Sequence, residues 1–342
     1  MTTRRRTDPR AAGRLMLATA LLAPLGVLGV AWAPARDVAS LARRWAPPPS
    51  RFVAIDGMRV HVRDEGPKDA TQPPVVLLHG TLSSLHTWDG WARDLARDRR
   101  VIRFDLPGFG LTGPAPDGDE GLARMVRTTF ALLDSLGVRR AVLAGNSLGG
   151  AVAWEAALAS PARVAGLVLV DAVGYTQEKR PIPPGFRVAD LPVLRQLTEE
   201  LLPKPLVEIG LREAYGDPSR LDEEVVTRYW QLARREGNRL ALVRRALKLP
   251  SDWSPQRLRT LDIPTLIVWG GRDRLIPPVH ADSFHHDLAR SKVVVLPELG
   301  HVPHEEDPAA SVAPVREFLG RLPGVLGVAA VPATHAGIAA AP

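Results

Sequence analysis

The pentapeptide Gly145-Asn146-Ser147-Leu148-Gly149 places a serine between two glycines, at the point where an apolar run gives way to a helical pattern. The pattern G-x-S-x-G is typical of a nucleophilic serine held at a sharp turn from a strand to a helix. Glycines are needed there because side chains would collide with neighbouring elements. The helix that follows would favour negative charge near Ser147. The sequence therefore predicts that Ser147 is a nucleophile.

A serine hydroxyl needs a base that takes its proton and a carboxylate that orients the base. Asp273, in "VWGGRDRLIPP", and His301, in "LPELGHVPHEEDP", each follow an apolar run that is typical of a strand. Both therefore lie at the rim where parallel strands end, and we predict that they complete a triad with Ser147. Asp171 also ends a strand and remains an alternative acid, whereas Asp105 in "DLPGFG" is expected to be structural.

Two backbone N–H groups are needed to stabilise the oxyanion that forms when a carbonyl is attacked. We expect one of them from Leu148, directly after the nucleophile. The other is expected from Thr81, which follows "LLHG" at the end of an early strand.

The elements around these residues alternate between strand-like and helical segments. "RFVAI" and "MRVHVRD" flank Asp56-Gly57 and predict a hairpin. Continuous apolar runs, typical of strands buried on both faces, occur in "PPVVLLHG", "RVIRFDLPG", "RRAVLAGNS", "ARVAGLVLVDA", "PTLIVWGG" and "SKVVVLPELG". Helical segments between most of them indicate a mostly parallel sheet with helices on both faces.

Between Val170 and Pro264 no strand is evident, and amphipathic text such as "LDEEVVTRYWQLARREGNRLALVRRAL" predicts helices. We therefore expect an α/β core over residues 51–172 and 259–322 and a helical cap over residues 173–258. Residues 1–50 are expected to form an N-terminal membrane anchor or signal segment followed by a linker. Residues 323–342 are expected to form a flexible tail.

The segments "HG" (79–80), "DLPGFG" (105–110), "GNSLGG" (145–150), "GGRDRLIPP" (270–278) and "GHVPHEEDP" (300–308) stand in the order and spacing of one family. Over residues 51 to 322 the chain resembles an α/β-hydrolase fold enzyme of the lid-bearing kind. The resemblance implies an eight-stranded, mostly parallel sheet, a helical cap inserted after strand 6, and Ser147, Asp273 and His301 as the catalytic triad.

The function expected from this resemblance is that of a serine hydrolase, similar to carboxylesterases, which cleaves a small hydrophobic ester through an acyl-enzyme on Ser147. No cofactor and no metal ion are expected. A serine at position 147, where dehalogenases and epoxide hydrolases of this fold carry aspartate, weighs against those two reactions.

Three alternatives remain open. The chain resembles the meta-cleavage C–C bond hydrolases in carrying Asn146 beside the serine. Those enzymes usually carry "HGGGPG" and a tryptophan after the catalytic histidine, whereas this chain has "HGTLSS" and Val302. Cofactor-free haloperoxidases or perhydrolases share the triad. An inactive hydrolase-fold binding protein is the alternative that is not an enzyme.

The positive charge of the chain is confined to one end. Residues 1 to 51 hold nine arginines and two aspartates, an excess equal to the net charge of +7 for all 342 residues. The remainder is neutral, which argues against a nucleic-acid partner. The sequence does not determine the oligomeric state.

Nineteen uncharged residues, 15–33, follow the arginines and are long enough for a helix to cross a membrane. We expect either a membrane anchor with the catalytic domain on the outer side, or a signal peptide whose removal yields a secreted or periplasmic protein. Ala31-Trp32-Ala33 fits a cleavage site, and Pro34 at the next position disfavours cleavage.

Overall fold

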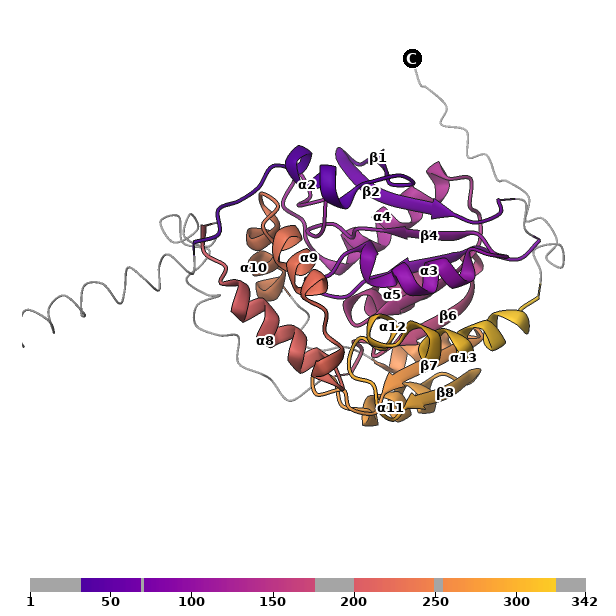
Figure 1. Ribbon diagram of the computed structural model, residues 1–342. Helices are drawn as coiled ribbons and strands as arrows, with labels where there is room; N and C mark the ends of the chain where they lie inside the picture. The colour runs from indigo at the N-terminus through magenta and orange to yellow at the C-terminus, as the bar shows by residue number, and fades with distance from the viewer. Residues whose placement is uncertain (1–31, 69–70, 176–199, 249–254, 324–342) are drawn as a thin grey trace, which may run out of the picture.

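The computed structural model describes residues 32–68, 71–175, 200–248 and 255–323. One eight-stranded sheet runs through the molecule in the order β1-β2-β4-β3-β5-β6-β7-β8 (Figure 1). The strands are β1 (Arg51–Ile55), β2 (Met58–Glu65), β3 (Val75–Leu78), β4 (Val101–Phe104), β5 (Ala141–Asn146), β6 (Val164–Val170), β7 (Thr265–Gly270) and β8 (Ser291–Leu296). β2 runs antiparallel to β1 and β4, and the remaining pairs are parallel. The predicted fold class is confirmed.

The hairpin at the edge of the sheet turns at Asp56 and Gly57, whose φ angles are 48° and 78°. Both values are positive, as a tight two-residue hairpin requires. Every residue of the five strands β3 to β7 is buried, whereas the two outermost strands, β1 and β8, are partly exposed. Five of the six continuous apolar runs therefore became inner strands that are covered on both faces. The prediction is wrong for "SKVVVLPELG", which forms β8, because a strand at the edge of the sheet has a neighbouring strand on one side only.

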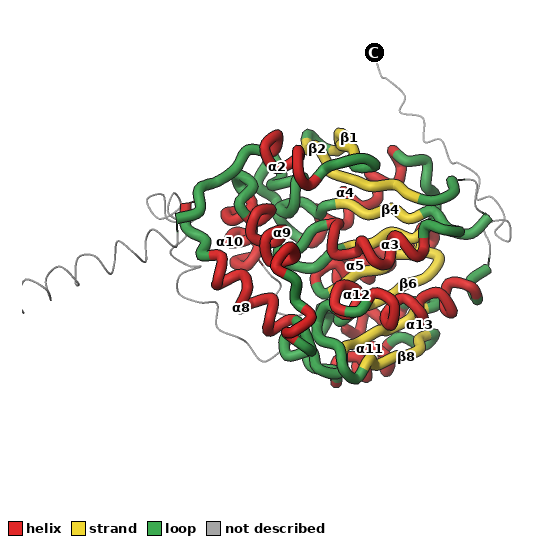
Figure 2. Tube along the Cα trace, in the orientation of Figure 1, coloured by secondary structure: helices red, strands yellow, loops and turns green. Residues whose placement is uncertain are grey.

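Helices cover both faces of the sheet (Figures 1 and 2). Val76 and Leu78 of β3 belong to a core cluster shared with one set of helices, and Val75 and Leu77 belong to a second cluster on the opposite face. This division follows from the two-residue period of a strand. The first face carries α4 (Leu122–Ser135), α5 (Leu148–Ala159) and α11 (Val279–Asp287), and the second carries α3 (Asp89–Leu95) and α13 (Pro308–Gly320).

Three further helices, α8 (Lys204–Ala214), α9 (Glu223–Ala233) and α10 (Asn238–Lys248), lie between β6 and β7 in the chain. They group at one side of the sheet as the helical cap (Figure 1). The start of α9 is set by Asp222, whose side chain accepts a hydrogen bond from the Glu224 N–H. The expected limits of the cap, 173 and 258, lie close to residues 176–199 and 249–254, which are not among the described residues. These limits therefore stay predictions.

Part of the expected N-terminal linker is a helix, α2 (Val38–Trp45). It begins after Asp37, whose carboxylate accepts a hydrogen bond from Ser40 N at 2.8 Å, and it buries Leu41 and Trp45, one turn apart. Leu41 and Trp45 pack with Leu232 of α9, so α2 joins the core to the cap.

Two expectations concern residues outside the described part of the chain. Of the uncharged stretch 15–33, only residues 32 and 33 belong to the described part. Of the expected tail, 323–342, only residue 323 does. Among the helices within the described ranges, none has both the length and the apolar character needed to span a membrane.

Candidate active site

Ser147 lies between the end of β5 and the start of α5, with φ 53° and ψ −116°. A positive φ is strained for a residue with a side chain, and costs on the order of 1–3 kcal/mol. Three backbone bonds hold it: Ser147 N–H donates to Val170 O at 3.0 Å, and Ser147 O accepts from Val173 N and Ala151 N at 3.1 and 3.2 Å. The surrounding structure therefore fixes the sharp turn that G-x-S-x-G predicts.

The glycines of this motif are required by close contacts of the backbone. A Cβ atom on Gly145 would lie 2.1 Å from Gly149 O, and one on Gly149 would lie 2.1 Å from Leu78 O. Real side chains do not tolerate such distances. The end of β5 and strand β3 can therefore lie against the first turn of α5 only because these two positions carry no side chain.

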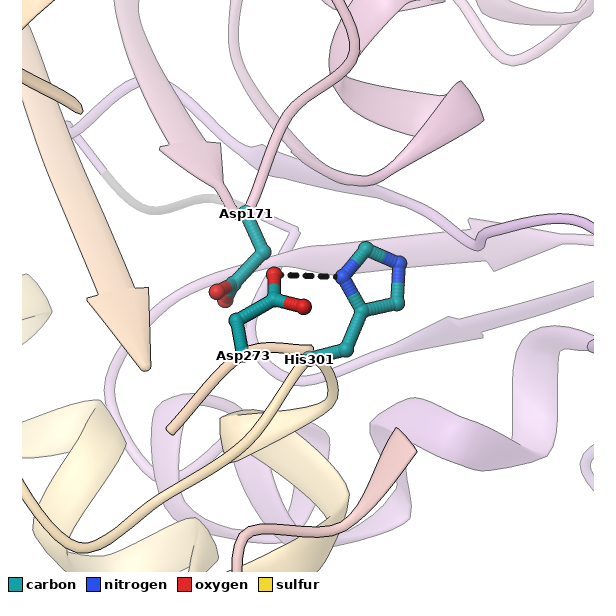
Figure 3. Close-up of side chains that lie close together, drawn as sticks. All are labelled: Asp171, Asp273 and His301. Atoms are coloured by element: carbon teal, nitrogen blue, oxygen red, sulfur yellow. Dashed lines mark hydrogen bonds and ion pairs between the residues drawn. The ribbon is translucent and has the colours of Figure 1, made fainter. Parts of the chain in front are cut away.

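His301 and Asp273 are joined at the same rim of the sheet. His301 Nδ1 lies 2.7 Å from Asp273 Oδ2, and the second ring nitrogen points away from the carboxylate (Figure 3). The other carboxylate oxygen of Asp273 accepts hydrogen bonds from Leu275 N and Ile276 N at 2.8 and 2.9 Å. Asp273 thus holds the histidine ring with Nδ1 protonated, which leaves Nε2 free to accept a proton.

Asn146 connects this histidine to the serine turn. Its side-chain amide donates to His301 O at 2.8 Å and to Val170 O at 3.2 Å. The residue directly before Ser147 therefore fixes the backbone of His301. In the sequence Asn146 stands out only through the family resemblance, because no local pattern signals a partner 155 residues away.

Among the described residues, the hydrogen bonds at Ser147 involve its backbone, and none reaches its hydroxyl. The three predicted triad residues thus lie at the carboxyl ends of β5, β7 and β8, and the structure joins two of them directly. Hydrogen bonds of catalytic groups are often long before substrate binds.

The loop that carries Thr81 lies beside the serine turn. A Cβ atom on Gly80 would lie 2.8 Å from Asn146 Oδ1 and 3.2 Å from Ser147 Cβ. Buried His79 braces this loop, since its Nδ1 donates to Gly80 O at 2.8 Å and its Nε2 accepts from Leu106 N at 3.0 Å. Burial lowers the pKa of His79, and this keeps the ring neutral.

Leu148 is the first residue of α5, so its N–H has no acceptor within the helix. Thr81 is exposed and directly follows Gly80. The two expected oxyanion donors therefore flank Ser147 from the helix and from the β3 loop. Their role remains a prediction.

Asp171, the alternative acid, lies beside Asp273 rather than in place of it. One carboxylate oxygen each of Asp171 and Asp273 and one ring nitrogen of His301 all lie within 4.8 Å of one another (Figure 3). The histidine nitrogen that faces this group is already hydrogen-bonded to Asp273, which favours acid–base chemistry over cation binding.

Asp105 is structural, with its carboxylate buried among donors. Its oxygens accept from Leu85 N at 2.8 Å, and from His61 Nδ1 and Leu111 N at 2.7 Å. Although burial opposes ionisation, the neighbouring His61 lowers the pKa of Asp105 below its ordinary value. Asp105 thereby fixes the turn after β4.

The cap contacts the histidine loop directly. His301 N–H donates to Ala214 O, the last residue of α8, at 2.7 Å. Glu305 forms an ion pair with Arg228 of α9 and accepts a hydrogen bond from the Tyr229 hydroxyl at 2.8 Å. Tyr229 also lies 3.0 Å from Ser83 Oγ, close to Thr81. The cap therefore helps to position two loops of the site.

The fold and this site define a hydrolase built on an α/β sheet, and comparison with known proteins agrees. A family model described as alpha/beta hydrolase fold matches residues 73–308, and the chain belongs to this family. The protein is therefore a hydrolase of the α/β fold.

Relatives and solved structures extend this result. The chain is 32% identical over 301 residues to an uncharacterized protein of Mycobacterium tuberculosis, Rv2715, covering 84% of this chain and 83% of the relative. It is 30% identical over 267 residues to a 2-hydroxy-6-oxo-6-phenylhexa-2,4-dienoate hydrolase of Burkholderia cepacia, covering 74% and 90%. A thermophilic esterase of Thermogutta terrifontis has a similar structure, with a TM-score of 0.65, 27% identity, and coverage of 79% and 97%.

Proposed function

We propose that this protein is a serine hydrolase that cleaves a small hydrophobic carboxylic ester through an acyl-enzyme on Ser147. The observation that carries the proposal is the strained turn at Ser147, whose neighbour Asn146 holds the backbone of the His301 that is paired with Asp273. Strained residues of this kind cluster at active sites.

In the proposed reaction, Ser147 Oγ attacks the ester carbonyl while His301 Nε2 takes the hydroxyl proton. The N–H groups of Thr81 and Leu148 stabilise the tetrahedral oxyanion, and Asp273 stabilises the imidazolium. His301 then gives its proton to the departing alcohol. Water, activated by the same histidine, attacks the acyl-enzyme and releases the acid, which restores Ser147.

An exposed apolar side chain adjoins the expected oxyanion loop. Leu82 directly follows Thr81 and is 45% exposed, whereas Leu148 and Val302, which follow Ser147 and His301, are buried in hydrophobic clusters. Leu82 would supply apolar contact area for the acyl or alcohol group, which supports a hydrophobic substrate. The similarity to a solved esterase agrees with ester cleavage.

The first test replaces Ser147 with alanine. Hydrolysis of nitrophenyl esters of graded chain length should fall by roughly 10⁴-fold or more, because the attacking oxygen is lost. A fluorophosphonate probe should label the unmodified protein and not the variant. Thermal unfolding checks that the variant is folded, and ester turnover that persists in a folded variant would contradict the proposal.

The second candidate is C–C bond hydrolysis of a meta-cleavage product. The observation that favours it is the similarity to the dienoate hydrolase, a relative that matches over most of its length. Assaying a dienoic ring-fission product beside the nitrophenyl esters separates the two candidates. A higher kcat/KM for the dienoic compound would favour the second one.

We also propose that residues 15–33 anchor the protein in a membrane, with the catalytic domain on the outer side. Ala33, at the end of the uncharged stretch, is only 1% exposed. Its N–H donates to Glu200 O at 2.8 Å, and its carbonyl accepts from Arg239 Nη1 at 2.7 Å. Cleavage after Ala33 would break these connections to the cap, which supports an uncleaved anchor. Mass spectrometry of the membrane-bound protein should find the N-terminus intact, and a mature protein that begins at residue 34 would contradict this.

A further inference from the structure

Two buried carboxyl groups adjoin each other behind His301. Asp171 follows β6 directly, has φ 46°, and is fully buried. Asp273 follows β7, the next strand in the sheet. Figure 3 shows the carboxyl group of Asp171 next to that of Asp273, on the side away from the free nitrogen of His301.

The two carboxyl groups differ in the number of donors that they face. Asp273 accepts three hydrogen bonds, from His301 Nδ1 and two backbone N–H groups, and these stabilise an anion. Asp171 accepts one, from Gly270 N to Oδ1 at 2.8 Å. Its Oδ2 atom is buried and has no hydrogen-bond partner among the described residues.

Two adjacent buried carboxyl groups do not both ionise. The anion belongs on Asp273, where three donors face it, and the proton belongs on Asp171. Burial raises the pKa of Asp171 well above its ordinary value, and the charges of Asp273 and, more weakly, Glu306 of α12 (Pro303–Glu306) raise it further.

We propose that Asp171 is a positioning residue that remains a neutral carboxylic acid and supports the Asp273 anion with its proton. It also has a reserve role, as the carboxylate that would orient His301 if Asp273 were absent. This inference rests on the proposed function. The Asp171 proton stays in place throughout. In acylation the Ser147 proton moves to His301 and on to the leaving alcohol, and in deacylation a water proton moves to His301 and on to Ser147 Oγ. If Asp273 is removed, Asp171 loses its negative neighbour, ionises, and becomes the carboxylate nearest to the histidine.

The kinetic test measures what Asp171 contributes with and without Asp273. Asp273→Ala suits it better than Asp273→Asn, because an asparagine amide would impose the wrong histidine tautomer. Asp171→Asn should lower kcat/KM less than about threefold in the otherwise unchanged chain, but at least about tenfold in the Asp273→Ala background. Equal losses in the two backgrounds would overturn the reserve role.

The pH profile gives a second readout that a merely structural residue would not move. In Asp273→Ala the reserve carboxylate exists only above the pKa of Asp171, which burial and, more weakly, the charge of Glu306 raise. The acid limb of kcat/KM should therefore move to higher pH than in the unmodified protein. An unmoved limb would overturn the proposal.

The protonation state is tested without catalysis by infrared difference spectroscopy at neutral pH. Subtracting the folded Asp171→Asn variant should reveal the carbonyl band of a protonated carboxylic acid. Asp64→Asn is the control, because Asp64 is ion-paired with Arg100 and should yield carboxylate bands only. Carboxylate bands from Asp171 would overturn the inference while labelling of Ser147 by fluorophosphonate continues, so the two proposals fail separately.

Discussion

Asn146 shows how one buried side chain serves both the fold and the site. Its amide reaches two backbone carbonyls, one at the end of β6 and one at His301. Because His301 lies on a loop, its position depends on contacts of this kind rather than on a regular element. The residue next to the serine therefore helps to set the distance from Ser147 to the histidine, together with Asp273 and the cap.

Replacing Asn146 with alanine should lower kcat by about tenfold or more, because a small displacement of a catalytic group has a large effect on rate. Two buried carbonyls would lose a partner, and the free energy of unfolding should fall by about 1–3 kcal/mol. Steady-state kinetics and urea unfolding measure both effects.

Asn238 offers a matched control in the cap. It is also buried and also donates to two carbonyls, Gly110 O and Leu232 O, at 3.0 and 2.9 Å. Asn238→Ala should lose similar stability but keep most of kcat. Equal losses of kcat in the two variants would show that Asn146 acts through stability alone.

At the scale of elements, α2 is locked to the core by a buried histidine in η1 (Leu85–Trp88). His86 Nε2 donates to Trp45 O, the end of α2, at 2.8 Å, and its Nδ1 lies 3.1 Å from Ser84 Oγ. Burial lowers the pKa of His86 from 6.5 to about 3. The charge of Asp105 opposes this shift, and the charges of Arg228 and Arg63 lower the pKa further. The neutral ring is thus part of the folded structure.

The sign of the resulting pH dependence follows from linkage. The unfolded chain binds a proton at His86 near pH 6.5, whereas the folded protein resists protonation until about pH 3. The stability supplied by neutral His86 is complete above pH 6.5 and is lost as the pH falls towards 3. Between pH 7 and pH 4 the loss should be on the order of 3 kcal/mol.

Urea unfolding between pH 7 and pH 4 tests this expectation. His86→Gln keeps a donor for Trp45 O without a titrating group, so its stability should fall less steeply with acid. Part of the pH dependence of stability should remain in His86→Gln, because burial also lowers the pKa values of other histidines such as His79 and His304. Exposed His285 is the control, and His285→Gln should follow the unmodified protein. A His86→Gln curve with the original slope would show that His86 does not titrate on unfolding.

At the scale of the whole molecule, the proposed anchor and the cap meet at Trp32 and Ala33. Trp32 pairs with Leu201, next to α8, and is exposed. Leu206 and Ile209, three residues apart on α8, are exposed as well. An anchor that ends at Ala33 would hold this apolar side of the cap at the bilayer surface, where tryptophan is favoured.

The chain contains no cysteine, so one introduced cysteine gives a unique site for a spin label. In proteoliposomes, a label on Ile209→Cys should be more accessible to oxygen and less accessible to a water-soluble nickel complex than the same label on Val279→Cys. Both positions are exposed to a similar degree, 58% and 62%, and Val279 lies on α11, outside the cap. Equal accessibility at the two positions would contradict the proposed orientation.

Much of this molecule was determined by the sequence itself. Glycines at 145 and 149, the hairpin at Asp56-Gly57, and the apolar runs each act within a few residues, so their patterns predicted the turn, the hairpin and the strands. Strand ends in a parallel sheet share one rim, and this was enough to predict that Asp273 and His301 lie near each other.

Only the tertiary structure decided which side chains meet across long separations. Asp171 and Asp273 both end strands, and the loop conformation after β7 placed Asp273 against His301 and Asp171 behind it. The partner of Asn146 and the burial of Ala33 were decided in the same way. The physical reason is that hydrophobic periodicity specifies an element and its buried face, whereas the contacts between distant loops depend on how the finished elements pack.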